Sequence, residues 1–419
     1  MQEFRQNKFQ RNVGTTFTAQ VLSAILAIIN AAIVARALGV EGKGTLSLLL
    51  LVPHMLGLFL GAGIGLANVY YVGTQRLDVS TLTQNSVGFA IVATIFGIIL
   101  VGAGAFSGGL TWVLPNIPAP LVYVALIGFP VALLGGYLNS VLHGLQRIAT
   151  LNLLTIIQSA ATLLLNVVLV VGFKLQLIGA LIASLSTSAV NLSIVIVLLH
   201  RLGGRFRPAW NPLVIRTTLS YGLRGYVGNI LQFFNYRLDM FIINYFLGSS
   251  GAGLYSVSVA IAELLWYLPN AVGFVILPKA AASEARDMNR FTPRVFGITL
   301  ALTALGGVGI AVLGQPFIRL IYSSDFLPAY TPLLALLPGV VLLGSAKVLT
   351  NEIAGRGYPH YNSINSALAL VVTIGLDMLL IPRYGVLGAA IASSAAYTLI
   401  FVTAVIFYSS VSRRSSEKA

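Results

Sequence analysis

The chain has 419 residues, of which 57% are hydrophobic and only 9% are charged, and its mean hydropathy is +0.90. A soluble globular domain carries about 25% charged residues, so this composition excludes an ordinary soluble protein and indicates a polytopic membrane protein. The formal net charge is +14. Because the basic residues lie mostly in short connections between apolar runs, this charge is typical of a topology signal and argues against nucleic-acid binding.

Apolar runs of about 20 residues, the length that crosses a bilayer, occur twelve times. The first run follows a polar, basic segment, but it is longer than the apolar part of a signal peptide and another run follows at once, so we interpret it as an uncleaved first span. The predicted spans are residues 13–37, 45–72, 82–106, 119–142, 151–172, 177–199, 217–247, 252–277, 295–315, 329–349, 361–381 and 386–409.

The distribution of Lys and Arg between the two sides supports this count. With the N-terminus in the cytoplasm, sixteen basic residues fall in inner segments and five in outer segments. One miscounted helix would exchange the sides of every later segment, so the bias predicts twelve spans with both termini cytoplasmic.

The outer connections are short, and the longest are residues 107–118 and 316–328. A membrane polymerase or ligase needs a larger region outside the membrane for its chemistry. The four His residues are scattered, and there is no cysteine for a thiolate metal site. We therefore expect a transporter that is not an enzyme and has no resident cofactor.

An internal repeat divides the chain into two halves. A shift of 209 residues, without gaps, aligns several separate segments of the first half with the second. Such parallel repeats predict two six-helix lobes related by a pseudo-two-fold axis along the membrane normal. The aligned segments are LGVEGKG (38–44) with LGSSGAG (247–253), Arg147 with Arg356, and GALIAS (179–184) with GAAIAS (388–393).

The hydrophilic segment 200–212 reads as the linker between the halves. The predicted domains are therefore residues 1–205 and residues 206–419.

Three segments resemble the polysaccharide-repeat (Wzx-type) flippases, whose superfamily includes the multidrug and toxin extruders and the lipid II flippase. They are ARALGVEGKG (35–44), YRLDMFIINYFLGSSGAGLYSVS (236–258) and GVLGAAIASSAAY (385–397). The resemblance covers nearly the whole chain and implies the all-helical fold of the multidrug extruders.

The resemblance implies a function as well. Such proteins carry an undecaprenyl-diphosphate-linked oligosaccharide from the inner to the outer leaflet by alternating access of two lobes. The implied setting is the bacterial inner membrane, with polysaccharide-assembly proteins as partners in lipopolysaccharide or exopolysaccharide synthesis. Each lobe could pack as a bundle on its own, so we expect a monomer. The alternatives are a drug extruder, a lipid II-type flippase, which typically has fourteen spans, and a membrane polymerase or ligase.

A diphosphate that crosses an apolar interior needs positive charge, which Arg supplies through paired donors and Lys as a point charge. Counting inward from Leu247 at about 1.5 Å per residue places Arg237 about 15 Å deep. The acid Glu263 lies close to aromatic residues that could contact sugar rings. The candidate substrate-binding residues are Arg237, Arg224, Lys347, Arg36 and Glu263.

Each of these residues also has a structural interpretation. Arg237 could pair with Asp239 or Glu263. Arg224 and Lys347 could extend to the inner headgroups, and Arg36 could anchor the outer interface.

The lipid II flippases have a sodium site on their seventh, eleventh and twelfth spans, and comparable positions here carry oxygen ligands. Under the shift of 209, the acid Asp239 falls on Asn30 and Asp377 on Val168, so only the second half has acids there. The alternatives are an ion pair of Asp239 with Arg237 and a helix cap by Asp377, and coupling to sodium, to protons or to neither stays open. The candidate cation ligands are Asp239, Thr373, Asp377, the carbonyl of Ala389, and Ser393.

The segment around Gly61, Gly63 and Gly65 contains three closely spaced glycines. No strand or P-loop sequence surrounds them, so we expect close helix packing there, not phosphate binding.

Overall fold

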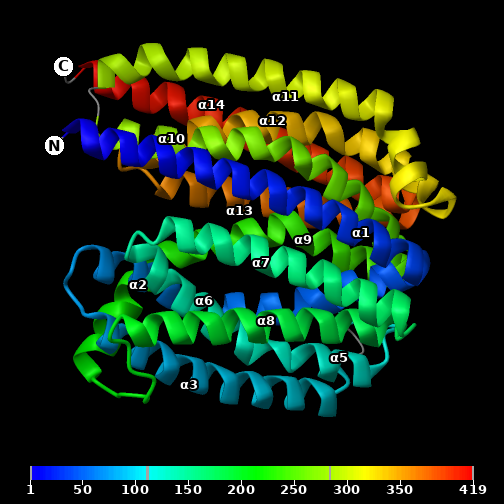
Figure 1. The fold of residues 1–419 in the computed structure, drawn as a ribbon. Coiled ribbons are helices and arrows are strands. Elements are labelled where there is room, and N and C mark those ends of the chain that lie inside the picture. The colour runs from blue at the N-terminus through cyan, green and yellow to red at the C-terminus, as the bar shows by residue number, and fades with distance from the viewer. Residues whose placement is uncertain (1, 110–112, 283–284, 418–419) are drawn as a thin grey trace. The chain divides into compact units, whose positions relative to one another are not determined.

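A computed structural model describes residues 2–109, 113–282 and 285–417, and every regular element in these ranges is helical (Figure 1). Side chains are described for residues 15, 16, 18–109, 113–223, 226–277, 279, 280 and 286–413. Contacts divide the chain into two compact units, Met1–Val227 and Gly228–Ala419, called here the first and the second unit.

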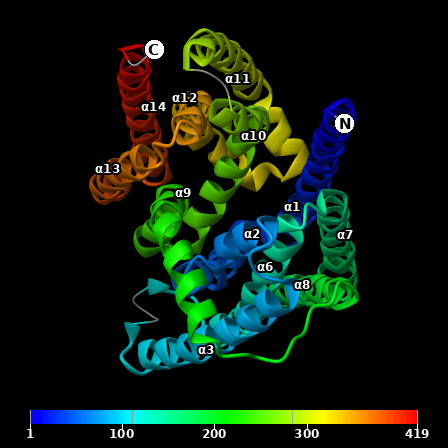
Figure 2. The same cartoon turned by 90° about the vertical axis from the view of Figure 1, so that its left-hand side faces the viewer.

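In the first unit, α6 is the central helix and contacts α2, α3 and α8 (Figure 2). A cluster of fully buried apolar side chains, including Leu82, Leu138 and Leu199, fills the space between these helices. The elements of this part of the chain are α1 (Gln2–Leu60), α2 (Ile64–Gly73), α3 (Val79–Phe106), α5 (Ala119–Leu126), α6 (Gly128–Gly144), α7 (Ile148–Asn166), the π-helix η1 (Val167–Gly172) and α8 (Gln176–Arg201).

In the second unit, α12 contacts α10, α11 and α14, and Figure 1 shows it beside α11 and α14. Helix α13 packs against α14. The elements here are α9 (Pro212–Ala262), which begins in the first unit, the 3₁₀ helix η2 (Glu263–Trp266), α10 (Tyr267–Ala282), α11 (Ala285–Ile321), the 3₁₀ helix η3 (Ser324–Ala329), α12 (Tyr330–Gly355), α13 (His360–Tyr384) and α14 (Val386–Glu417).

The units divide within α9, beyond the predicted boundary at residue 205. The start of α9 packs on the first unit, where Asn85 Nδ2 donates to Thr218 Oγ1 at 3.2 Å. Further along, the backbones of Gly222 and Gly63 approach so closely that a Cβ on either residue would overlap the other. The expectation that Gly63 allows close packing is thus confirmed.

Ten helices in the described ranges are long and apolar enough to cross a membrane. Two of them, Thr18–Leu60 and Tyr226–Leu277, have 43 and 52 residues. At 1.5 Å per residue, an unbroken helix of either length would be more than about 60 Å long, roughly twice the hydrocarbon thickness. The twelve predicted spans therefore correspond to ten helices, two of which hold two predicted spans each.

Both long helices break at a glycine where one predicted span ends and the next begins. The dihedral angles are φ 68° and ψ −174° at Gly39, and φ 72° and ψ −175° at Gly248. Only glycine adopts this region readily. The two positions are 209 residues apart, so the repeat seen in the sequence is present in the backbone.

A constant shift of 209 does not hold throughout the chain. The turn after α6 has its cap at Leu145 (φ −72°, ψ 2°), and the matching cap after α12 is Arg356 (φ −75°, ψ 2°). These positions are 211 apart. Arg147 and Arg356 are therefore not equivalent, although the constant shift of 209 predicted that they would be.

The shift of 211 continues through α7 and α13. The buried residues of α7 and η1 all fall on buried residues of α13, and Thr162 falls on Thr373. Two extra residues in the turn after η1 restore the shift of 209 by α8, where the buried Ala180 falls on the buried Ala389. The pairs buried on both sides are Leu154 with Asn365, Asn166 with Asp377, and Val170 with Ile381.

The counterpart of Asp377 is therefore Asn166, not Val168. Asn166 Nδ2 donates to Asn30 Oδ1 at 2.8 Å, and Asn30 is the counterpart of Asp239. Asp239 and Asp377 thus each have an asparagine counterpart in the first unit.

Candidate functional site

Arg237 and Glu263 form a bidentate ion pair. Nη1 of Arg237 lies 2.7 Å from Oε1, and Nη2 lies 3.0 Å from Oε2. The same Nη1 donates to the backbone carbonyl of Tyr236 at 2.9 Å. The predicted alternative of a local pair with Glu263 is therefore present. The side chains are still 30% and 24% exposed, so both charges stay accessible.

Lys347 lies next to this pair. Its Nζ donates to Asn270 Oδ1 at 2.9 Å and sits 4.0 Å from the centroid of the Trp266 ring and 5.9 Å from that of Tyr236. Trp266 is fixed in turn because its indole N–H donates to the carbonyl of Val340 at 3.0 Å. The structure thus brings together three of the predicted substrate-binding residues. We call Arg237, Glu263, Lys347, Tyr236 and Trp266 the basic cluster.

The other two predicted substrate-binding residues are placed differently. Arg36 is exposed on α1, three residues before the break at Gly39, in the first unit. Arg224 lies on α9, and its side chain is outside the described residues.

Asp239, two residues after Arg237, is almost fully buried. Its carboxylate accepts hydrogen bonds from the hydroxyl of Tyr255, from Ser393 Oγ at 3.0 Å and from the backbone N–H of Met240 at 2.8 Å. The hydroxyls of Tyr255 and Ser393 are themselves 3.0 Å apart. The described residues show no salt bridge between Asp239 and Arg237, which pairs with Glu263 instead.

Asp377 is fully buried, and neither of its carboxyl oxygens has a hydrogen-bond partner among the described residues. It interacts electrostatically with Asp239. It lies inside α13, two turns before the end of that helix at Tyr384, so it does not cap the helix. One turn earlier, Thr373 Oγ1 donates to the carbonyl of Ala369 at 3.0 Å.

These residues fit a small hard cation or a proton. The two unpartnered oxygens of Asp377 offer a buried negative charge, and carboxylate and hydroxyl oxygens are the ligands that hard cations prefer. In the described part of the chain, no group of three or more His, Cys, Asp or Glu could hold a metal ion. A cation here would therefore use two carboxylates and neutral oxygens. We call Asp239, Asp377, Thr373, Ser393 and Tyr255 the acid pair site.

Tyr255 was not predicted, although the sequence contains a signal for it. Asp239 lies nine residues before Gly248 and Tyr255 lies seven residues after it. A chain reversal at that glycine brings the two to about the same level. The two predicted spans, joined by LGSSGAG, therefore contain enough information to place Tyr255 beside Asp239.

Residues 33–331 match the family described as "Polysaccharide biosynthesis protein". The chain belongs to this family. Among curated proteins, it is 23% identical over 46% of its length to an uncharacterized membrane protein of Methanocaldococcus jannaschii. It is 21% identical over 44% of its length to a Haloferax volcanii protein named "Probable low-salt glycan biosynthesis flippase Agl15". These matches span 39% and 40% of the relatives' own lengths.

Two solved structures share the fold of this family member. The lipid II flippase MurJ in an inward closed conformation has a TM-score of 0.77 and 15% identity, over 95% of this chain and 90% of that one. An inward-facing multidrug resistance MATE family transporter of the MOP superfamily has a TM-score of 0.71 and 15% identity, over 94% and 95%. The resemblance to this superfamily and the expected fold class are confirmed.

Proposed function

We propose that this protein is a flippase that moves oligosaccharide repeat units, linked to undecaprenyl diphosphate, from the inner to the outer leaflet by alternating access. The observation that carries the proposal is the basic cluster, which places two cations and one anion inside apolar spans of a polysaccharide biosynthesis protein. Charges inside a membrane protein are costly and mark a working surface by default. The glycan flippase among the relatives supports the same substrate class.

The basic cluster can bind a diphosphate in a simple way. Glu263 holds the guanidinium of Arg237 in one orientation, and an incoming diphosphate competes with this carboxylate for the same paired donors. Lys347 adds a point charge that Trp266 and Asn270 hold in place. Two phosphates exceed the charge of one carboxylate, so the exchange favours the substrate.

We propose that a sodium ion or a proton drives transport through the acid pair site. When bound, it would supply the positive charge that offsets two buried carboxyl groups, with Asp239, Asp377, Thr373, Ser393 and the Ala389 carbonyl as its ligands. Arg237 interacts electrostatically with Asp239, so the charge at this site changes the field in the basic cluster. This link supports coupling between ion and substrate.

We propose that the protein lies in the cytoplasmic membrane, the inner membrane of a bacterium, with both termini inside. Proteins that polymerise or attach the glycan would receive the product in the outer leaflet. A monomer suffices, because each unit has its own buried core.

The test is a flipping assay in proteoliposomes with a defined undecaprenyl-diphosphate-linked oligosaccharide. We expect Arg237→Gln and Lys347→Gln each to slow flipping about tenfold or more, because one charge-assisted contact contributes roughly 1.5–3 kcal/mol. Arg319→Gln, an exposed residue of α11 outside the cluster, is the matched control and should flip at the normal rate. Full activity in both cluster variants would refute the proposed role of the cluster.

A drug extruder of the same fold is the second candidate function. The shared fold with the MATE transporter, at a TM-score of 0.71, is the observation behind it. An extruder of lipophilic cations needs a chamber without excess positive charge. The basic cluster has two positive charges and one negative charge, so it does not meet this requirement. Efflux of a lipophilic cation dye from the same proteoliposomes, without lipid flipping, would establish this alternative.

A further inference from the structure

Tyr397 of α14 belongs to neither the basic cluster nor the acid pair site, yet it packs directly on the first of them. The centroid of its ring lies 6.0 Å from those of both Tyr236 and Trp266, at interplanar angles of 86° and 63°. Tyr236 and Trp266 are 5.1 Å apart in turn. The three rings thus form one group, in the edge-on and tilted geometries that aromatic pairs prefer. Tyr397 is only 4% exposed, so this group lies inside the second unit.

The same residue lies beside the acid pair site. Ser393, whose Oγ donates to Asp239 at 3.0 Å, precedes Tyr397 by four residues on α14. Residues four apart are neighbours on one face of a helix. Tyr397 also interacts electrostatically with Asp239 and with Glu263 of the basic cluster. A single turn of α14 therefore faces both sites.

Ser394, on the same turn, fixes α14 against α12. The backbone N–H of Gly339 donates to Ser394 Oγ at 2.9 Å, and a Cβ at Gly339 would lie 2.5 Å from the Cα of Ser394. Only glycine allows this approach. The next residue of α12, Val340, accepts the indole N–H of Trp266. The turn of α14 thus acts on Trp266 in two ways, through the ring of Tyr397 and through the helix that holds the indole.

The backbone contact between these helices is repeated in the first unit. A Cβ at Gly128 of α6 would lie 2.8 Å from Cδ2 of Leu185 in α8. These residues correspond to Gly339 and Ser394 at the shifts of 211 and 209, so both helix pairs approach at equivalent positions. The close packing of α14 on α12 is therefore part of the scaffold that the two units share.

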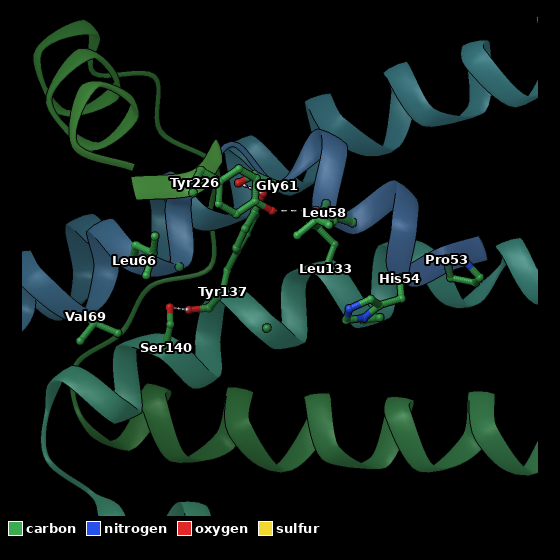
Figure 3. Close-up of a pocket in the computed structure, with 15 residues that line it drawn as sticks. Pro53, His54, Leu58, Gly61, Leu66, Val69, Leu133, Tyr137, Ser140 and Tyr226 are labelled. Carbon is green, nitrogen blue, oxygen red and sulfur yellow. Dashed lines mark hydrogen bonds between the residues drawn. The ribbon is translucent and has the colours of Figure 1, made fainter. Parts of the chain in front are cut away.

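The three rings, in contrast, have no counterpart in the sequence of the first unit. The shift of 209 places Ala27, Gly57 and Ser188 at their positions. Gly57 lines a cavity of about 410 Å³, which Figure 3 shows next to the break between α1 and α2. This break divides the predicted span 45–72. The unit with asparagines in place of the acids thus has open space where the second unit has Trp266.

We infer that Tyr397 links the acid pair site to the basic cluster, so that a cation bound at the first strengthens diphosphate binding at the second. The inference rests on the proposed function and names the residue through which its two sites communicate. Tyr397 acts as a positioning residue. Its ring packs on Trp266, and the Trp266 ring in turn holds the ammonium group of Lys347.

The direction of the effect follows from charge. Asp239 attracts Arg237 while its own charge is not offset. A cation at the acid pair site offsets that charge and leaves the guanidinium available to a phosphate. Because such linkage is reciprocal, the diphosphate should strengthen cation binding by the same factor.

Binding of undecaprenyl diphosphate to the full-length protein in nanodiscs tests the inference. The Kd is measured in sodium and in choline at equal ionic strength, and again at two pH values, so that an effect of either sodium or protons is detected. We expect one of these cations to lower the wild-type Kd about tenfold, which is roughly 1.4 kcal/mol of coupling.

Substitutions at one position then separate the ring from the hydroxyl. Tyr397→Leu removes the ring, so it should remove the effect of the cation and leave the Kd measured without it unchanged. Tyr397→Phe keeps the ring and should retain the effect. Tyr397→Met keeps more of the buried volume and serves if Tyr397→Leu does not fold. The matched control is Phe401→Leu, which removes a ring one turn later on α14 that stacks on Phe296, and it should retain the effect.

The fluorescence of Trp266 gives a second readout, in a background that carries Trp112→Phe and Trp210→Phe. The cation should shift the Trp266 emission, because the Tyr397 ring packs on the indole. In Tyr397→Leu the emission should no longer respond to the cation. A residue with only a structural role would change the emission itself and leave its response to the cation intact.

The outcomes separate this inference from the proposed function. If the wild type shows the effect and both Tyr397→Leu and Tyr397→Met retain it in full, the role of Tyr397 is refuted and the proposed function survives. If the wild type binds the probe equally with and without either cation, the coupling is contradicted together with this inference, and diphosphate binding stands. If the wild type does not bind the probe, the proposed function itself is contradicted.

Discussion

The two carboxylates of the acid pair site, Asp239 and Asp377, differ sharply in their surroundings. Asp239 has three hydrogen-bond donors, whereas the carboxyl oxygens of Asp377 have no partner among the described residues. Burying an unpaired charge costs several kcal/mol in practice. Asp377 is therefore the residue whose burial a bound cation or proton would stabilise most. Asp239 is held in position by hydrogen bonds from Tyr255 and Ser393.

This difference predicts how the two variants behave. Asp377→Asn removes an uncompensated buried charge, so we expect the thermal unfolding temperature to be unchanged or higher. Asp239→Asn keeps an oxygen that can accept from Tyr255 and should fold normally. Both should abolish any dependence of flipping on a sodium or pH gradient, measured in proteoliposomes with imposed gradients. Dependence that persists at wild-type strength in both variants would remove the acid pair site from the mechanism.

At the scale of elements, the hydropathy of the sequence was enough to predict the helices, because a bilayer-crossing helix needs a continuous apolar run. The break at Gly61–Gly63 was not predictable in this way, since its residues are as apolar as their neighbours. The equivalence of Asp377 and Asn166 was missed for another reason. The second half has two extra residues before the turn after α12, and the first half has two extra residues after η1. An ungapped shift of 209 therefore aligns the two ends of the repeat correctly and misaligns the segment between them.

The breaks at Gly39 and Gly248 give a prediction for this scale. A Cβ at Gly248 meets no atom within 4 Å, so the cost of Gly248→Ala is conformational strain alone. We expect a loss of roughly 1–3 kcal/mol in the free energy of unfolding, seen as a lower thermal unfolding temperature in detergent. Gly309→Ala, in the helical backbone of α11 and equally open, is the control.

The control should change stability in the opposite direction. Alanine in a regular helix is favoured over glycine by roughly 1 kcal/mol, so Gly309→Ala should keep or raise the unfolding temperature. Equal effects of the two substitutions would mean that the backbone at Gly248 is ordinary helix, and the two-span interpretation of α9 would lose its support.

At the scale of the whole molecule, the repeat shows what distinguishes the units. Three neutral oxygen ligands proposed for the cation, those of Thr373, Ser393 and the Ala389 carbonyl, have identical counterparts in the first unit. Thr162 matches Thr373 and bonds the carbonyl of Gln158 at 2.8 Å, as Thr373 bonds that of Ala369. Ser184 matches Ser393, and Ala180 matches Ala389. Both acids are replaced by asparagine, which leaves the same scaffold without charge.

Under the proposed mechanism, charge alone would decide which unit responds to an ion. We predict that Asn30→Asp with Asn166→Asp, placed in a background of Asp239→Asn and Asp377→Asn, moves the ion response to the first unit. Its unfolding temperature should rise with sodium or as the pH falls, because two buried carboxyl groups repel each other until a cation or proton offsets one charge. The background variant alone should show neither response.

The reason lies in the scaffold, since Thr162, Ser184 and the Ala180 carbonyl already supply neutral oxygens. Tyr255 has no counterpart, because Leu46 stands at its place, so the transplanted site should respond more weakly than the native one. Adding Leu46→Tyr should then strengthen the response. A four-fold variant that folds but responds no more than its background would show that the surrounding helices, and not the two acids, determine where the ion acts.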